Sequence, residues 1–109
     1  MVKIKLSTDF SDTPGGRLIE EGEYSGELFR DTLLIQKFEE AEQNNDYLEI
    51  DFDDCYGVGT SFLEEAFGGL VRHYSKKGVM DRIRIVAVED ETIPGNIKKY
   101  VEEAEGKDK

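Results

Sequence analysis

The sequence has little of what several common kinds of protein site require. Cys55 is the only cysteine, so no disulfide can form within the chain, which suits a reducing compartment. His73 is the only histidine, and we find no acid–base cluster around which catalysis could be built. No apolar run is long enough to cross a bilayer, and the first residues lack the apolar core of a secretory signal. We therefore expect a cytoplasmic protein that is not an enzyme.

Basic residues are also scarce relative to acidic ones. The chain has 14 lysines and arginines against 25 aspartates and glutamates, which gives a net charge of -11. This excess opposes binding to nucleic-acid phosphates and to anionic membranes, and it favours basic partners. The 109 residues contain no repeat and suit one domain, which we place at 1–104. We expect the charged tail, 105–109, to fray.

The hydrophobic pattern alternates between two periods along the chain. Apolar residues at every second position predict strands at 2–6 and 47–52, and a branched apolar run predicts a strand at 83–88 that is covered on both faces. Helical spacing predicts helices at 25–42, 61–74 and 94–104, and 18–24 could hold a short extra strand. Together these elements predict an α/β fold, a small mixed sheet with parallel pairs covered by about three helices.

Residues typical of helix ends support these boundaries. Ser25 is a good N-cap, and the pair Asn44 and Asn45 is a good stop. Gly78 suits the end of the second helix, and Pro94 suits the first position of the third. Functional loops of such folds lie beyond the carboxyl ends of the strands, which points to 53–60.

The helix at 61–74 has the clearest pattern, but two glycines interrupt it. Gly68 and Gly69 each cost about 1 kcal/mol relative to alanine inside a helix, so something must compensate. Close packing of the helix on the sheet and close approach by a partner's backbone are both adequate explanations.

Several short motifs resemble those of a known family. They are Gly16–Arg17, Ser25–Gly26, Phe29–Arg30, Thr60–Leu63 and Glu65–Gly68, in that order and spacing. Together they resemble the STAS-like domains of unknown function, relatives of the anti-sigma-factor antagonists. The resemblance implies a STAS-like fold that docks a regulatory protein, for which an anti-sigma-type kinase-like ATPase is one partner class.

The resemblance also gives a role to the start of the second long helix. In anti-sigma-factor antagonists the partner kinase phosphorylates a serine there, and the phosphate blocks docking. Ser61 resembles that serine and Thr60 is its neighbour, although Gly59 stands where those proteins have an acidic residue and Phe62 where they have glycine. Ser61 and Glu64 also fit an S-x-x-E capping box, so a helix cap and a phosphorylation site both remain open.

These arguments define a predicted docking site and its regulation. The expected phospho-acceptors are Ser61 and Thr60, and a phosphate there would lie at a helix start and change the local charge. The predicted partner-binding residues flank them: Asp53, Asp54, Gly57, Gly59, Phe62, Glu64 and Glu65.

Other functions are possible for the same loop. Gly57 and Gly59 form a partial dinucleotide fingerprint, so a small-ligand or nucleotide-binding domain that uses residues 57–60 is the alternative. However, Phe62 replaces the third glycine, and we expect no cofactor. A structural subunit with a constant partner is a third possibility.

Metal and thiol chemistry are poorly supported. A calcium loop that began at Asp51 would need an oxygen ligand at position 55, where the chain has Cys55, so we expect no metal. His73 lies about three helical turns beyond the loop that holds Cys55, too far for a nucleophilic pair. The sequence does not specify the partner's identity or the oligomeric state.

Overall fold

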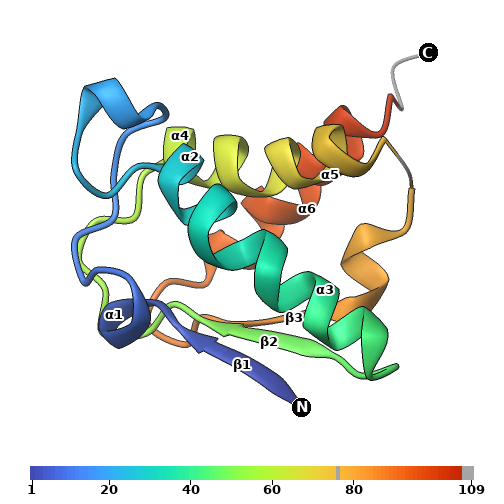
Figure 1. Ribbon diagram of the computed structural model, residues 1–109. Coiled ribbons are helices and arrows are strands. Elements are labelled where there is room, and N and C mark those ends of the chain that lie inside the picture. Colours follow the sequence, from blue (N-terminus) through green and yellow to red (C-terminus); the bar gives the residue numbers. More distant parts are fainter. Residues whose placement is uncertain (76, 107–109) are drawn as a thin grey trace.

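The computed structural model describes residues 1–75 and 77–106, and three short strands form its sheet (Figure 1). The strands are β1 (Val2–Lys5), β2 (Leu48–Asp51) and β3 (Ile83–Val86). They lie in the order β1-β2-β3, and both neighbouring pairs are parallel. Parallel neighbours need long crossovers, which the helices between the strands supply. The predicted α/β fold is confirmed.

The two faces of the sheet differ in polarity. Ile4, Ile50 and Ile85 are level in the strand register and belong to the apolar core or pack against it. The residues that precede them in each strand form a charged row, Lys3, Glu49 and Arg84. Because successive side chains point to opposite faces, this charged row lies on the face away from the core.

One strand differs from its prediction. The strand predicted at 83–88 ends at Val86, and Val88 is 78% exposed. Arg84 is also exposed, so the expectation that this strand is covered on both faces is wrong. The near-continuous apolar run gave a wrong expectation, because the long helices cover one face of the sheet and the face that carries Lys3, Glu49 and Arg84 stays uncovered along all three strands (Figure 1).

Three long helical stretches lie on one side of the sheet (Figure 1). Each of the first two contains a π-helical segment. The label η is used for these π-helical segments and also for 3-10 helices. The first stretch is α2 (Gly26–Phe29), η2 (Arg30–Leu34) and α3 (Ile35–Gln43); the second is α4 (Thr60–Leu63), η3 (Glu64–Gly68) and α5 (Gly69–Tyr74); the third is α6 (Thr92–Ala104). The apolar sides of these helices and one face of the sheet enclose a single core. The largest fully buried side chains of this core include Phe29, Phe38, Phe62, Phe67, Leu34 and Leu70.

The first long helix begins and ends as predicted. The Ser25 hydroxyl accepts a hydrogen bond from the Leu28 N–H at 3.1 Å, which caps the helix. Asn44 follows the last helical residue, and Asn45 adopts a left-handed φ of 51°. The residue types at its ends predict this helix correctly because the groups that they bond to are near in sequence.

Two other boundaries are corrected. Pro94 is the third residue of α6 rather than the first, because the Asp90 carboxylate accepts from the Thr92 N–H at 3.0 Å and starts the helix earlier. The second helix ends at Tyr74, and its C-cap is Ser75, with φ 53°, rather than Gly78. Gly78 instead precedes a 3-10 helix, η4 (Val79–Arg82).

The sequence patterns did not predict two short elements near the N-terminus. A four-residue helix, α1 (Leu6–Asp9), follows β1 directly. The possible strand at 18–24 does not form, and the segment contains the 3-10 helix η1 (Ile19–Glu21). The Glu21 carboxylate accepts from the N–H groups of Arg17 and Leu18 at 2.9 and 3.2 Å, which folds the segment back on itself.

In the described part of the chain, no helix is both long and apolar enough to span a membrane. Of the predicted tail, residues 107–109 lie outside the described residues, and α6 ends just before it at Ala104.

Candidate functional site

The loop between β2 and α4 lies beyond the carboxyl ends of the strands. On one side, the Phe52 N–H donates to the Val86 carbonyl of β3 at 2.8 Å. On the other side, the Tyr56 N–H donates to the Asp12 carbonyl, in the segment after α1, at 2.7 Å. Backbone hydrogen bonds therefore join the loop region to the end of β3 and to the segment that follows α1.

Carboxylates hold the first half of this loop. The Asp54 N–H donates to the Glu89 carboxylate at 2.7 Å, and the Glu89 N–H donates to the Asp53 carboxylate at 2.9 Å. The Asp53 N–H also donates to the Asp51 carboxylate at 2.8 Å. Asp53 thus has a part in shaping the loop, whereas the Asp54 side chain is 66% exposed and pairs with Lys5 at 3.1 Å.

The two loop glycines have different roles. Gly57 has a left-handed φ of 64°, which glycine adopts without strain, so it serves the tight turn. Gly59 is extended and is the N-cap residue of α4, and its carbonyl accepts from the Leu63 N–H at 3.2 Å. A Cβ at Gly59 would meet nothing within 4 Å, so space alone does not require glycine there.

Thr60 and Ser61 are exposed at the start of α4. Ser61 is the second helical residue, and within the described part of the chain its hydroxyl makes no hydrogen bond. The Glu64 side chain binds arginines instead of the helix start. The capping-box interpretation of Ser61 and Glu64 is therefore wrong.

Phe62 lies beneath this surface. It is fully buried and packs against the rings of Phe29 and Phe10, with centroids at 5.6 and 6.2 Å. Among the predicted partner-binding residues, Phe62 therefore supports the helix start from the core side.

Glu64 and Glu65 belong to a group of ion pairs with Arg17, Arg30 and Arg72, which we call the Arg–Glu network. Arg30 lies 2.6 Å from Glu65, Arg72 lies 2.8 Å from Glu64, and Arg17 binds Glu64 directly and lies 3.5 Å from Glu65. Hydrogen bonds from Arg72, and then from Arg17, hold the pKa of the Glu64 carboxyl below its ordinary value. The network joins the two long helices to the segment that carries Arg17.

The helix glycines make room for this network. A Cβ at Gly69 would collide with the Arg30 guanidinium, and one at Gly68 would lie 2.7 Å from the Glu64 carboxylate. The close packing expected of Gly68 and Gly69 is therefore made with the ion pairs and the neighbouring helix, and not with the sheet. No partner backbone is needed to explain them.

The family motifs, which are scattered in sequence, converge at this place. Besides the Arg–Glu network, the Gly26 N–H donates to the Gly16 carbonyl, and the Glu27 N–H donates to the Arg17 carbonyl, both at 3.0 Å. Gly26 also lies against the Phe62 carbonyl, where a Cβ would come within 2.5 Å. The motif residues thus fix how α2, α4 and the Arg17 segment meet, directly behind the exposed Ser61.

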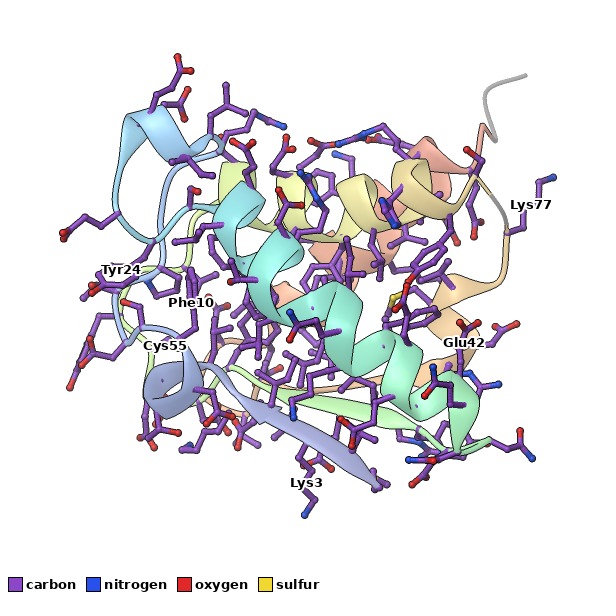
Figure 2. All side chains as sticks on the ribbon, viewed as in Figure 1. Lys3, Phe10, Tyr24, Glu42, Cys55 and Lys77 are labelled. Carbon is purple, nitrogen blue, oxygen red and sulfur yellow. The ribbon has the colours of Figure 1, made fainter. Side chains whose placement is uncertain are left out.

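Sequence reasoning missed the aromatic side chains of this region. Tyr56, in the loop, is 71% exposed, and Tyr24 is 41% exposed. Tyr24 meets Phe10 edge to face with ring centroids 5.6 Å apart, and both lie on the same side of the molecule as Cys55 (Figure 2). Their exposure depends on how distant segments hold the loop, so no local pattern reveals it.

The Cys55 thiol and the His73 imidazole contact different residues. Cys55 is half-buried with its Sγ 3.8 Å from the Ser11 carbonyl, whereas His73 is exposed and its ring meets Tyr74. Burial, followed by the Asp12 charge, raises the pKa of the Cys55 thiol to about 11. A thiol that stays protonated at neutral pH is a poor nucleophile.

Ligand chemistry has little support at the glycine loop. Cavities of about 490, 380 and 480 Å³ are present, and none of these three is lined by residues 57–60. Among the described residues, no group of three or more histidine, cysteine or acidic side chains could hold a metal ion.

Comparison with known proteins gives one match. The model of a family described as STAS-like domain of unknown function (DUF4325) matches residues 25–92, well over half of the chain. No curated protein and no solved structure matches. The matched range includes the first two long helical stretches, β2, β3 and the loop before Ser61, but not the Gly16–Arg17 motif. The chain therefore belongs to the family of STAS-like domains of unknown function.

Proposed function

We propose that the chain is a non-enzymatic docking domain that binds a regulatory protein through its 53–60 loop and the exposed start of α4, which we call the docking surface. The observation that carries this proposal is Tyr56, 71% exposed on a loop whose backbone is hydrogen-bonded on both sides. Large aromatic side chains on a rigid support are typical anchors of protein interfaces, because they bury much area at little entropic cost.

The charge around Tyr56 indicates the kind of partner. Asp12, Asp54 and Glu89 are exposed beside the loop, and the chain as a whole is strongly acidic. The nearby Lys5 is engaged by Asp51 and Asp54 at 3.6 and 3.1 Å. A partner with an apolar pocket and a basic rim fits this surface, since complementary charge speeds association and suppresses wrong partners.

Phosphorylation of Ser61, with Thr60 as its neighbour, is the proposed control. A phosphate at the second helical position is favoured by the helix dipole and the free N–H groups of the first turn. Ser61 lies one helical turn before Glu64 and Glu65, so the phosphate would compete with Glu64 for Arg17. By family resemblance, the partner and modifying enzyme would be an anti-sigma-type kinase-like ATPase.

Capture experiments with matched variants test the docking proposal. Tagged wild-type protein, Tyr56→Ala and Tyr47→Ala are expressed in the native cell, and bound proteins are identified by mass spectrometry. Tyr47 is a fair control because it is 43% exposed but lies just before β2, at the other end of that strand. We expect a partner that is retained by wild type and Tyr47→Ala and lost by Tyr56→Ala. Equal capture by all three proteins would refute docking through Tyr56.

The control by phosphorylation is tested separately. Phosphopeptide mapping of the protein from its native cell should find phosphate on Ser61, and incubation with the captured partner and ATP should label wild type but not Ser61→Ala. Ser61→Glu should release the partner that Ser61→Ala retains. If Ser61→Glu binds as wild type does and Ser61 carries no phosphate, the domain docks without this switch.

A further inference from the structure

The outer edge of β3 is open in the part of the chain that the structure describes. The Phe52 N–H donates to the Val86 carbonyl, so the backbone groups of Val86 point towards β2. In a strand, alternate residues point to opposite sides, so the N–H and C=O groups of Ile85 point outward. The Ala87 N–H also points outward, because it is trans to the Val86 carbonyl across one peptide bond. An edge of this kind is a template for a further strand.

The two edges of the sheet are protected to different degrees. β1, at the other edge, carries Lys3 and Lys5, the kind of charged side chain that deters pairing. β3 carries Arg84, whose guanidinium lies 4.2 Å from the centroid of the Tyr47 ring and is thereby drawn back over the sheet. The edge of β3 is the less protected of the two.

A groove runs beside this edge under α6. It has a volume of about 480 Å³, and its apolar lining includes Met80, Ile85, Pro94 and Val101. Ile4 and Ile50, level with Ile85 in the register, are 1% and 0% exposed, whereas Ile85 is only partly buried. The row Ile4, Ile50 and Ile85 is thus partly exposed at its β3 end, and one more strand beside β3 could cover it.

The rim of the groove has a definite charge. Asp81, Glu102 and Glu105 line it together with one basic residue, Lys98. The Glu105 carboxylate accepts from the Gly78 N–H at 3.0 Å, which fixes it across the groove. An acidic rim, on a chain of net charge -11, repels a second copy and attracts basic side chains.

We propose that the open edge of β3 and the groove under α6 bind an extended segment of a partner protein whose groove-facing residues are apolar in the middle and basic at both ends. The segment adds a fourth strand through the outward groups of Ile85 and Ala87. Its apolar side chains enter the groove, and its basic residues meet Glu102 and the rest of the rim. This binding mode takes affinity from the backbone and specificity from alternate side chains. It does not depend on the docking surface around Tyr56.

A designed peptide tests the proposal directly. The probe is a seven-residue peptide with valine at positions 3 and 5, lysine at positions 1 and 7 and serine at the even positions, so that its valines and lysines share one face. It is titrated into isotope-labelled full-length protein and followed by NMR. We expect the amide signals of Ile85 and Ala87 and of the groove residues to shift. Two further peptides carry N-methyl groups on alternate residues, one on the odd positions and one on the even positions. Because a strand bonds to an edge through every second residue, one methylated peptide should lose binding and the other should keep it.

Two charge reversals on one helix supply the matched control. Glu102→Lys at the rim should weaken binding about fivefold, whereas Glu103→Lys, one residue along and exposed outside the groove, should change it less than twofold. Equal weakening by both variants, or survival of binding with both methylated peptides, would mean that a cationic peptide adheres to any acidic surface, and would overturn the proposal. A protein dimer that the peptide disperses in sedimentation runs would also overturn it, in favour of a second copy.

Discussion

Gly26 illustrates how one residue can fix the meeting of two helices. A Cβ at this position would lie 2.5 Å from the Phe62 carbonyl and 3.2 Å from the Ala66 nitrogen, both backbone atoms that cannot move without shifting the second long helix. We expect Gly26→Ala to reduce the free energy of unfolding by about 1–3 kcal/mol, the usual range for overpacking. Chemical denaturation followed by circular dichroism measures the change.

The control for Gly26→Ala is Gly95→Ala. Gly95 lies in α6, and a Cβ there would meet nothing within 4 Å. Alanine favours the helix by about 1 kcal/mol over glycine, so Gly95→Ala should stabilise the protein. If both variants change stability in the same direction, the close contact at Gly26 does not control the packing.

Cys55 should be a slow thiol in the folded protein. Burial first, and then the Asp12 charge, raises its pKa from 9.0 to about 11, so the thiolate fraction at neutral pH should fall about 100-fold. We expect iodoacetamide at pH 7 to alkylate Cys55 about 100-fold more slowly in the native protein than in guanidinium chloride. Similar rates in the two conditions would show that the thiol is not shielded as described.

Ser61 shows why local patterns predict elements better than sites. Both Ser25 and Ser61 precede helical patterns, but only Ser25 caps, with a bond to an amide three residues away. At Ser61 the pattern fails because Glu64 is drawn to Arg17, which lies 47 positions away in sequence. Long-range partners of this kind leave no local signal, and the same holds for the exposure of Tyr56.

At the scale of whole elements, the periodic patterns were sufficient for the helices at 25–42 and 61–74 and for the strands β1 and β2. These patterns failed for elements that are too short to show a repeating hydrophobic pattern. α1 has four residues, and the Asp9 carboxylate accepts from the Lys5 N–H at 2.8 Å at the point where the strand turns into the helix. A side-chain bond therefore ends the strand, which apolar alternation cannot reveal.

The segment that carries Arg17 should depend on its ion pairs for order. It is attached by backbone bonds from Gly26 and Glu27, and Arg17 is the side chain that ties it to Glu64 and Glu65. We expect Arg17→Ala to speed amide hydrogen exchange in residues 15–24 while lowering global stability by about 1 kcal/mol or less. Arg72→Ala also removes a partner of Glu64, but from within its own helix, and should leave exchange in 15–24 unchanged. Equal effects of the two variants would contradict the role assigned to Arg17.

The same network gives the second long helix a defined response to pH. The pKa of the Glu64 carboxyl is held below its ordinary value of 4.5 by Arg72 and Arg17, so its ionised form stabilises the fold. This contribution is complete above pH 4.5 and disappears as the pH falls through the lowered pKa of the folded state. Below pH 4.5, wild type should therefore lose stability more steeply than Glu64→Gln in denaturation at a series of pH values. Parallel curves for the two proteins would exclude a stabilising Glu64 charge.

At the scale of the whole molecule, the two proposed surfaces consist of different residues. The docking surface consists of residues 53–60 and the start of α4, whereas the groove under α6 is lined by other residues, among them Ile85, Val101 and Glu102. The molecule has an extent of 32 × 31 × 26 Å, so one small domain carries both surfaces. Binding at both proposed surfaces would let the domain hold two basic partners at once.

Separate surfaces predict independent effects. Tyr56→Ala should abolish partner capture without changing affinity for the lysine–valine peptide. Glu102→Lys should weaken peptide binding about fivefold without changing partner capture. The double variant should show the sum of the two free-energy changes, because the sites share no contacting residues and distant changes are usually additive within about 0.5 kcal/mol. Titration calorimetry with the captured partner and the peptide measures both terms in all four proteins. If the peptide weakens partner binding, and Glu102→Lys removes that effect, the two surfaces are coupled through the core and the partners exclude each other.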